Sequence, residues 1–366
     1  MSSPDDTSDA TLRARKTSHL ELCRSEQVEH DVKTTLFDDV ELIHNSLPEL
    51  SVDDIDTTTV FLGKTLQLPL LITGMTGGTA EAFAVNRDLA TIAERLGIAF
   101  GLGSQRVMQR DPETAWTFAV REFAPTTVLL ANIGLVQARD QSTGEVARLV
   151  TAVGADALCL HLNPAQELVQ PEGDRDFRGG LETIARLSRE LTVPIIIKET
   201  GCGVSAGVAA ALQAIGVRYI DVSGAGGTSW VRVEMLRAGA ETRRLGETFS
   251  NWGIPTAACL AMLSPLDAHL IASGGMRNGL DVAKALALGA QLCGFALPVY
   301  RAYRDGGIPA AVDFVEQMKL EITAAMVLTG SRTVEQLRRQ PVVLGERIRA
   351  WLDAKPARSE DGRKET

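Results

Sequence analysis

The chain has 366 residues, of which 45% are hydrophobic and 23% charged, a composition typical of a globular protein that excludes a disordered chain or a fibre. The formal net charge of −9 argues against nucleic acid as a partner, although a local cluster of Arg and Lys can still form a site for an anionic substrate. Five scattered cysteines without a CxxC pair, an N-terminus without the apolar run of a signal peptide, and no stretch long enough to span a bilayer predict a cytoplasmic enzyme with no membrane partner.

The two ends of the chain differ in composition from its centre. We expect a disordered lead at residues 1–11, a single domain at 12–353 and a disordered, charged tail at 354–366. Mixed helix and loop is predicted between residues 12 and 50, which forms an extension before the core. Three cationic or potentially cationic residues, Arg15, Lys16 and His19, lie in this extension. They fit either a solvated arm or a lid over an anionic ligand.

From residue 66 onward, eight predicted strands alternate with helices. The strands are 66–73, 98–102, 127–131, 157–163, 193–197, 218–222, 269–272 and 291–294. The helices are 81–96, 112–123, 143–153, 181–191, 205–215, 255–263, 280–288 and 308–328. Such alternation predicts parallel strands, which occur in doubly wound sheets and in barrels. Because all eight strands end in small or polar residues, we predict the α/β class and a (β/α)8 TIM barrel, preceded by the N-terminal helical and loop extension.

The predicted strand 157–163 alternates strictly, so its residues divide between two faces. One face carries Leu158, Leu160 and Leu162, and the other carries Ala157, Cys159, His161 and Asn163. The second face becomes polar toward the carboxyl end, where Gln166 and Glu167 follow. A buried strand with a satisfied histidine explains this pattern, and so does a strand that ends at an active-site mouth.

Glycine-rich turns follow the last predicted strands, at residues 273–277 and 294–296. Loops at these two positions form the recurrent phosphate site of barrels, although tight turns without a ligand also use glycine. Lys198 points inward and needs a partner, and Asn132 and Ser104 face the same cavity. A phosphate cup, an inward lysine and ring-edge hydrogen-bonding groups together predict FMN as a cofactor.

A second ligand is predicted above the flavin. Arg106, His161 and Asn163 lie at the mouth, where the cationic N-terminal extension can reach over them. This positive charge on an acidic protein predicts a polyanionic substrate. Glu167 in such a site fits a Mg²⁺ ion held against a diphosphate, or else a rim carboxylate in water.

Several motifs together resemble the type 2, flavin-dependent isopentenyl-diphosphate isomerase family. The matching segments are Arg15-Lys16 with His19, Leu47-Pro48-Glu49, Met75-Thr76-Gly77-Gly78, Gly103-Ser104-Gln105-Arg106, Ala131-Asn132-Ile133-Gly134, 161–167, 172–177, Lys198-Glu199, 221–224 with 227–230, 252–256, and 273–275 with Arg277. They occur in the family's order from residue 15 to residue 298. One mild departure is Thr17-Ser18, where the family is more acidic.

The resemblance implies an enzyme of isoprenoid biosynthesis that interconverts isopentenyl and dimethylallyl diphosphate by a 1,3-allylic proton shift. Reduced FMN acts as acid and base, NADPH only reduces the flavin, and Mg²⁺ binds Glu167. The implied FMN contacts are Met75, Thr76, Gly77, Ser104, Asn132, Lys198, Ser223, Thr228, Gly275, Met276, Arg277, Ala296 and Leu297. The substrate contacts are Arg15, Lys16, Ser104, Gln105, Arg106 and Gln166, to which the reasoning from residues adds His19 and Asn163. Gln166 and His161 are the expected catalytic groups, and family members form homo-tetramers or octamers.

Two other interpretations remain open at this point. An FMN oxidoreductase acting on a 2-hydroxy acid or a nucleotide needs a catalytic His with an Arg, or a reactive cysteine loop, for which Cys202 is the one candidate. A non-catalytic flavin-binding protein is the second alternative. The presence of Arg106, Gln166 and Glu167 together argues against it.

Overall fold

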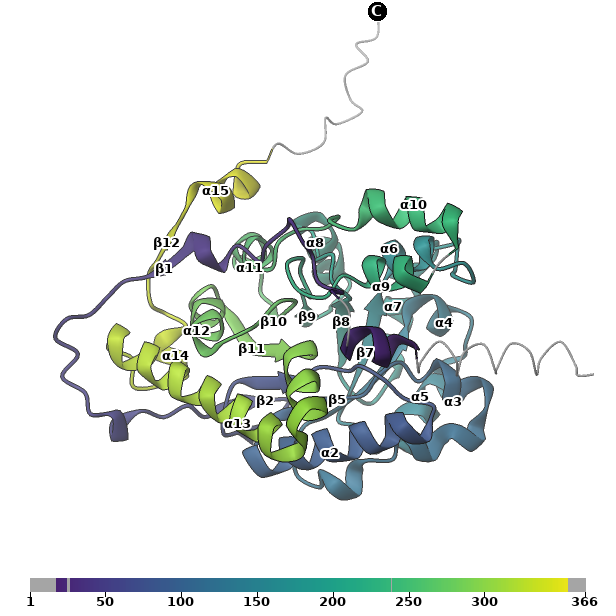
Figure 1. The fold of residues 1–366 in the computed structure, drawn as a ribbon, viewed down its shortest axis with the longest axis horizontal. Helices are drawn as coiled ribbons and strands as arrows, with labels where there is room; N and C mark the ends of the chain where they lie inside the picture. Colours follow the sequence, from purple (N-terminus) through teal and green to yellow (C-terminus); the bar gives the residue numbers. More distant parts are fainter. Residues whose placement is uncertain (1–17, 25–26, 238, 355–366) are drawn as a thin grey trace, which may run out of the picture.

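Eight parallel strands close into a barrel in the computed structural model, which describes residues 18–24, 27–237 and 239–354 (Figure 1). The strands follow the order β10-β11-β4-β5-β6-β7-β8-β9 around the barrel. Their bounds are β4 Leu70–Ile72, β5 Ala99–Gly101, β6 Leu129–Gly134, β7 Ala157–Leu162, β8 Ile195–Glu199, β9 Tyr219–Asp221, β10 His269–Ser273 and β11 Ala290–Phe295. The predicted (β/α)8 barrel is therefore confirmed.

Helices follow the strands and cover the barrel. They are α2 Ala80–Leu96, α3 Arg106–Arg110, α4 Leu135–Arg139, α5 Thr143–Ala152, α6 Pro164–Val169, α7 Gly180–Glu190, α8 Ala206–Ala214, α9 Trp230–Arg237, α10 Ala240–Phe249, α11 Thr256–Leu263, α12 Gly279–Ala287, α13 Leu297–Thr329, α14 Val334–Leu337 and α15 Glu346–Leu352. Side-chain caps fix several of their first residues, as in α5, where Ser142 and Glu145 form a capping box. None of the helices in the described residues is long and apolar enough to cross a membrane.

The alternation in β7 separates two hydrophobic layers. Leu158 and Leu160 belong to the large cluster between barrel and helices, whereas Ala157 and Cys159 belong to a smaller cluster that fills the barrel. A hairpin of β2 (Thr59–Phe61) and β3 (Lys64–Leu66) adds Phe61 and Leu66 to the inner cluster. Lys64 of this hairpin donates to the Thr127 carbonyl, just before β6, so the hairpin closes the amino end of the barrel. The carboxyl end is thus left for a site.

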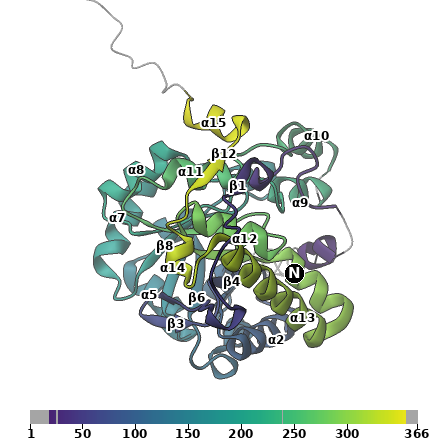
Figure 2. The same cartoon turned by 90° about the vertical axis from the view of Figure 1, so that its left-hand side faces the viewer.

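Segments from both ends of the chain meet outside the barrel. β1 (Val40–Leu42) pairs antiparallel with β12 (Val342–Leu344), and α15 follows beside them, as both views show (Figures 1 and 2). A short helix at residues 18–24, here called the N-terminal helix, lies against the start of α13 (Figure 2). The Tyr300 hydroxyl donates to the Leu20 carbonyl across this contact. The extension predicted before the core therefore packs against it at two places.

Two predicted helices differ from the structure. Residues 112–123 form two 3-10 helices, η3 (Pro112–Phe118) and η4 (Arg121–Phe123), instead of one α-helix. The hydroxyls of Thr114 and Thr117 donate to carbonyls three residues earlier, which favours the tighter turn. The predicted last helix, 308–328, is the part of α13 that follows the non-helical Gly306 and Gly307, and the helical segment that precedes them from Leu297 was not predicted.

Other elements were not anticipated. The stretch between the predicted strand 218–222 and the predicted helix 255–263, to which no element was assigned, contains α9 and α10. The predicted lead at 1–11 lies outside the described residues, as does the predicted tail apart from Ala354. The division into domains stays a prediction.

Candidate active site

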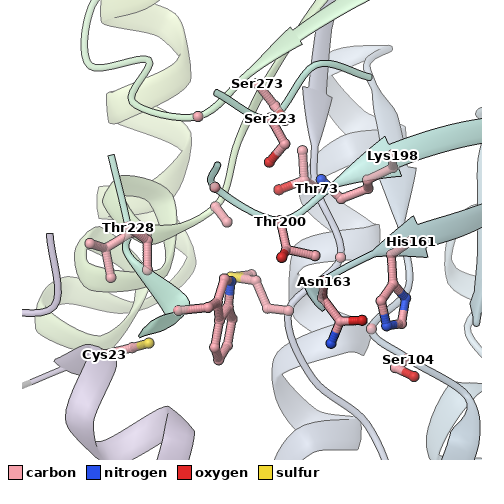
Figure 3. Close-up of a pocket in the computed structure, with 18 of the residues that line it drawn as sticks. Cys23, Thr73, Ser104, His161, Asn163, Lys198, Thr200, Ser223, Thr228 and Ser273 are labelled. Atoms are coloured by element: carbon pink, nitrogen blue, oxygen red, sulfur yellow. The ribbon is translucent and has the colours of Figure 1, made fainter. Parts of the chain in front are cut away.

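A pocket opens at the carboxyl ends of the barrel strands, where the sequence predicted a site. Outside Arg15 and Lys16, twenty positions were predicted to act in catalysis or to bind cofactor, substrate or metal, and most of them line this pocket. Those that line it are His19, Met75, Thr76, Ser104, Arg106, Asn132, His161, Asn163, Gln166, Glu167, Lys198, Ser223, Thr228, Gly275, Arg277, Ala296 and Leu297. Arg15 and Lys16 lie outside the described residues. In Figure 3, His161, Asn163 and Lys198 project into the same space as Ser223, Ser273 and Thr228.

Strand register builds the floor of the pocket. His161 of β7 lies opposite Lys198 of β8, which lies opposite Asp221 of β9. The Lys198 Nζ donates to Asp221 Oδ2 at 3.1 Å, and the other Asp221 oxygen accepts from the Ser273 hydroxyl at 2.6 Å. Asp221 is only 2% exposed, so this pair is shielded from water. The inward lysine thus has its partner, and Asp221 fixes the position of the Lys198 amino group at the floor of the pocket.

Asp221 was not among the predicted site residues. It also accepts from the backbone N–H of Ser223 at 3.2 Å, which helps to hold Ser223 in a left-handed conformation, with φ of 35°. A non-glycine residue in this conformation is uncommon and costs free energy. The signal was present in the Asp221-Val-Ser-Gly motif, but the sequence alone did not show that Asp221 faces Lys198.

Close backbone packing shapes the end of the pocket predicted to hold phosphate. Gly274 and Gly275 after β10 have φ of 96° and 92°, and a Cβ on Gly274 would collide with the Gly224 carbonyl. Arg277 follows, with its guanidinium bonded to the Met276 carbonyl at 2.8 Å and paired with Glu29. The backbone and a cation thus converge at this end.

The middle of the pocket offers groups that fit a flavin ring. The Thr76 hydroxyl is buried and has no hydrogen-bond partner among the described residues. Asn132 donates to the Leu102 carbonyl at 3.0 Å, while its Oδ1 lies 2.8 Å from His161 Nδ1. Buried polar atoms without a partner are rare, so Thr76 indicates a ligand at this point. These residues therefore fit FMN.

The rim centres on the first turn of α6. Pro164 begins this helix, and Asn163 just before it donates to Gln166 Oε1 at 3.2 Å and to Glu167 Oε1 at 2.9 Å. The other Glu167 oxygen accepts from the backbone N–H of Asp174 at 2.8 Å. Amide and carboxylate are therefore held side by side at the mouth.

Glu234 of α9 is a buried residue in contact with Gln166 of the rim, and the sequence analysis missed it. Its carboxylate is fully buried and accepts from His19 Nε2 at 2.9 Å, from Gln166 Nε2 at 3.2 Å and from Arg237. Burial alone would raise the pKa of Glu234, but the hydrogen bonds and charges of His19 and Arg237 lower it to about 2. Glu234 is thus a carboxylate at neutral pH that orients the Gln166 amide. Glu234 lies in a stretch to which the sequence analysis assigned no element, and no motif there distinguishes it from nearby glutamates.

Arg106 supplies a cation near the mouth. Its Nε is buried and has no hydrogen-bond partner among the described residues, and its Nη1 lies 3.8 Å from Asp174. A buried guanidinium nitrogen left in this way fits an anionic ligand. Within the described part of the chain, no group of three or more His, Cys, Asp and Glu side chains could hold a metal ion. A cation at Glu167 would therefore share its ligands with a bound substrate.

Three predicted contacts do not line the pocket. Gln105 is fully buried and turns away, since its amide donates to the Leu149 carbonyl at 3.0 Å and accepts from the Asn132 backbone N–H at 3.0 Å. Met276 packs in the hydrophobic core, and Gly77 lies against the ring of Phe118. In each case, other residues of the same motif line the pocket, namely Ser104 and Arg106, Gly275 and Arg277, and Met75 and Thr76.

The fold places the chain in the class of (β/α)8 barrels. A model of the FMN-dependent dehydrogenase family matches residues 163–344. Solved structures agree on the fold. A lactate oxidase of Pediococcus acidilactici has a TM-score of 0.65 at 14% identity, covering 94% of this chain and 95% of that one. A mandelate oxidase has a TM-score of 0.63 at 17% identity, covering 91% and 99%.

Relatives of higher identity define the family more narrowly. An isopentenyl-diphosphate delta-isomerase of Metallosphaera sedula is 46% identical over 358 residues, covering 94% of this chain and 96% of the relative. One of Nostoc sp. is 45% identical over 342 residues, covering 92% and 97%. The chain belongs to the isopentenyl-diphosphate delta-isomerase family, as the motifs predicted.

Proposed function

We propose that the protein interconverts isopentenyl and dimethylallyl diphosphate by a 1,3-allylic proton shift in isoprenoid biosynthesis. The observation that carries this proposal is the orientation of Gln166, whose neutral amide lies in the pocket between Asn163 and the buried carboxylate of Glu234. A proton shift on an alkene needs groups that orient the reacting carbons without trapping charge beside them. An amide that both donates and accepts meets this requirement.

FMN is the proposed cofactor, since the matching family model is FMN-dependent and the glycine turns, Thr76 and Lys198 fit it. When bound in its reduced form, FMN supplies the acid and base of the proton shift. Lys198, fixed by Asp221, would bind beside the ring, and Arg277 would bind the phosphate. These contacts stay predictions, as do the finer assignments of His161 and Gln166 to catalysis.

Glu167 is the proposed Mg²⁺ ligand. A single carboxylate is enough if the diphosphate supplies further oxygens, as is usual for Mg²⁺ in phosphate sites. Arg106 and His19 line the same region and would bind the remaining negative charge. NADPH as the flavin reductant, a homo-oligomer and a cytoplasmic location also stay predictions.

Replacing Gln166 with Leu tests the proposal. The variant keeps the side-chain size but cannot hydrogen-bond to Glu234 or Asn163, so we expect kcat to fall by about 100-fold while FMN content stays the same. Isomerisation of isopentenyl diphosphate, flavin content and Tm are measured on one preparation. If Gln166 only caps the α6 turn, Tm falls in step with activity. Parental kcat in a folded, FMN-loaded variant would contradict the assigned role.

A hydroxy-acid oxidoreductase is not favoured. The mandelate and lactate oxidases share the fold at 14–17% identity in the structures above, which establishes architecture alone. Cys202, the one candidate for a reactive cysteine loop, is not activated, because burial raises the pKa of its thiol far above the ordinary value.

A further inference from the structure

Glu29 connects two parts of the molecule through one carboxylate. One of its oxygens pairs with the guanidinium of Arg277, and the other lies 3.3 Å from Arg301 Nη1. All three side chains are about two-thirds buried. Charge pairs of this exposure are only partly screened by solvent. A charge that binds one arginine therefore changes the strength of the ion pair between Glu29 and the other arginine.

The backbone fixes Glu29 in this position. Glu29 forms an antiparallel bridge with Thr228, the Ser229 N–H donates to the Val28 carbonyl at 2.8 Å, and the His30 N–H donates to the Gly227 carbonyl at 2.9 Å. Residues 227–229 belong to the loop after β9, and Thr228 lines the pocket. The carboxylate therefore projects from a rigid edge of the site and not from a mobile arm.

The two arginines serve different ends of the pocket. Arg277 follows the glycine turn after β10, where the proposed function places the flavin phosphate. Arg301, on α13, donates through Nε to the carbonyl of Cys23 at 3.0 Å. Cys23 lies in the last turn of the N-terminal helix. That helix contributes His19, Leu20 and Cys23 to the pocket wall. Arg301 thus holds the helix that covers the mouth.

A phosphate at Arg277 changes the balance between the two pairs. It carries close to two negative charges and competes with Glu29 for the Arg277 guanidinium. Repulsion from the phosphate favours the pairing of Glu29 with Arg301, which fixes the guanidinium that holds the Cys23 carbonyl. We propose that Glu29 is a positioning residue that couples occupancy of the flavin-phosphate site to closure of the N-terminal helix over the mouth. The inference rests on the proposed function for the identity of the two ligands.

A neighbouring ion pair offers a matched control. Arg304, one turn after Arg301 on α13, pairs with Glu81 of α2 at 2.8 Å. Neither Glu81 nor Arg304 lines the pocket. Glu81→Gln therefore removes a carboxylate that pairs with α13 but leaves the contacts of Glu29 with Arg277 and Arg301 unchanged.

The first experiment measures the affinity of the full-length apoprotein for FMN by titration, with and without isopentenyl diphosphate and Mg²⁺. In the parent we expect the second ligand to tighten FMN binding about five- to tenfold, within the usual range for coupled sites. In Glu29→Gln the coupling factor falls to about one, while FMN alone binds at least as tightly as in the parent because a repelling charge is gone. Glu81→Gln keeps the parental factor.

The second experiment follows tryptic cleavage after Arg24, which is exposed at the end of the N-terminal helix. FMN should slow this cleavage several-fold in the parent and in Glu81→Gln, but not in Glu29→Gln. Riboflavin, which lacks the phosphate, should protect none of them. If Glu29→Gln fails to fold, Arg301→Gln breaks the same connection at its other end and is tested in the same way.

The outcomes separate this inference from the proposed function. Failure of the parent to bind FMN or isopentenyl diphosphate overturns both. Binding of both ligands with a coupling factor of one, an undiminished factor in Glu29→Gln, or equal protection by riboflavin and FMN overturns the coupling role of Glu29 alone.

Discussion

Two buried carboxylates near the pocket, Glu199 after β8 and Glu234 on α9, have opposite electrostatic surroundings. One oxygen of Glu199 accepts from the backbone N–H groups of Thr200, Gly201 and Cys202, at 2.6 Å and 2.7 Å for the first two. Burial nevertheless raises the pKa of Glu199 to about 7, against the lowering effect of these bonds and of Lys198. Glu234 faces His19 and Arg237, and its pKa is lowered to about 2.

Burial acts to raise the pKa of both carboxyl groups, but at Glu234 it is outweighed by the hydrogen bond from His19 and by the charges of His19 and Arg237, whereas at Glu199 the three backbone hydrogen bonds and Lys198 do not outweigh it. Glu199 shapes a loop, since Thr200 and Gly201 line the pocket, and its protonation state changes near neutral pH. Glu234 keeps a permanent charge beside Gln166. Glu199 therefore fixes the shape of a loop that lines the pocket, whereas Glu234 supplies a negative charge beside Gln166.

The largest effect is expected from Glu234→Gln. It removes the charge that His19 and Arg237 face, and breaking such a buried pair costs about 3 kcal/mol or more of unfolding free energy. Denaturant unfolding at pH 7 measures this loss, and we expect a fall in kcat of about 10-fold or more because the acceptor of the Gln166 amide loses its charge. Glu247→Gln, which breaks the exposed pair with Arg243, should change neither quantity appreciably. A Glu234→Gln variant of parental stability would remove the contrast between the two carboxylates.

A second effect appears in the pH dependence of stability. Because the pKa of Glu199 is raised from its usual 4.5 to about 7, the folded protein binds this proton more tightly than the unfolded chain does. Its contribution to the unfolding free energy is then fully present below pH 4.5 and declines by up to about 3 kcal/mol as the pH rises to 7. Glu199→Gln should lack this decline. Identical slopes between pH 4.5 and 7 in the two proteins would show that the pKa of Glu199 is not raised in the folded protein.

The smallest effect concerns Cys202, next to Glu199 in the same loop. Burial and the Glu199 charge raise the pKa of its thiol, so little thiolate forms at pH 8. Alkylation of the folded protein by iodoacetamide should be much slower at Cys202 than in the unfolded chain, as followed by mass spectrometry. Cys202→Ala should keep kcat within about twofold. Rapid alkylation together with lost activity would revive the reactive-cysteine alternative.

Residues placed by the register of neighbouring strands could be predicted from the sequence, whereas residues placed by contacts between distant segments could not. Strand period and polar strand ends predicted the barrel and placed His161 and Lys198 at its mouth, since sheet register brings them together. Asp221 and Glu234 were missed. Glu234 meets His19 across 215 residues of sequence through the packing of α9 against the N-terminal helix, and no local pattern encodes such a contact. Gln105 lies in a predicted motif, but its amide satisfies buried backbone groups, which the motif alone could not reveal.

The stoichiometry of NADPH in the presence of isopentenyl diphosphate, FMN and Mg²⁺ distinguishes an isomerase from an oxidoreductase most directly. An isomerase causes no net oxidation, so we expect many molecules of dimethylallyl diphosphate to form for each NADPH consumed in reducing the flavin. Consumption of one NADPH per turnover, or no conversion of isopentenyl diphosphate by the FMN-loaded protein, would contradict this expectation.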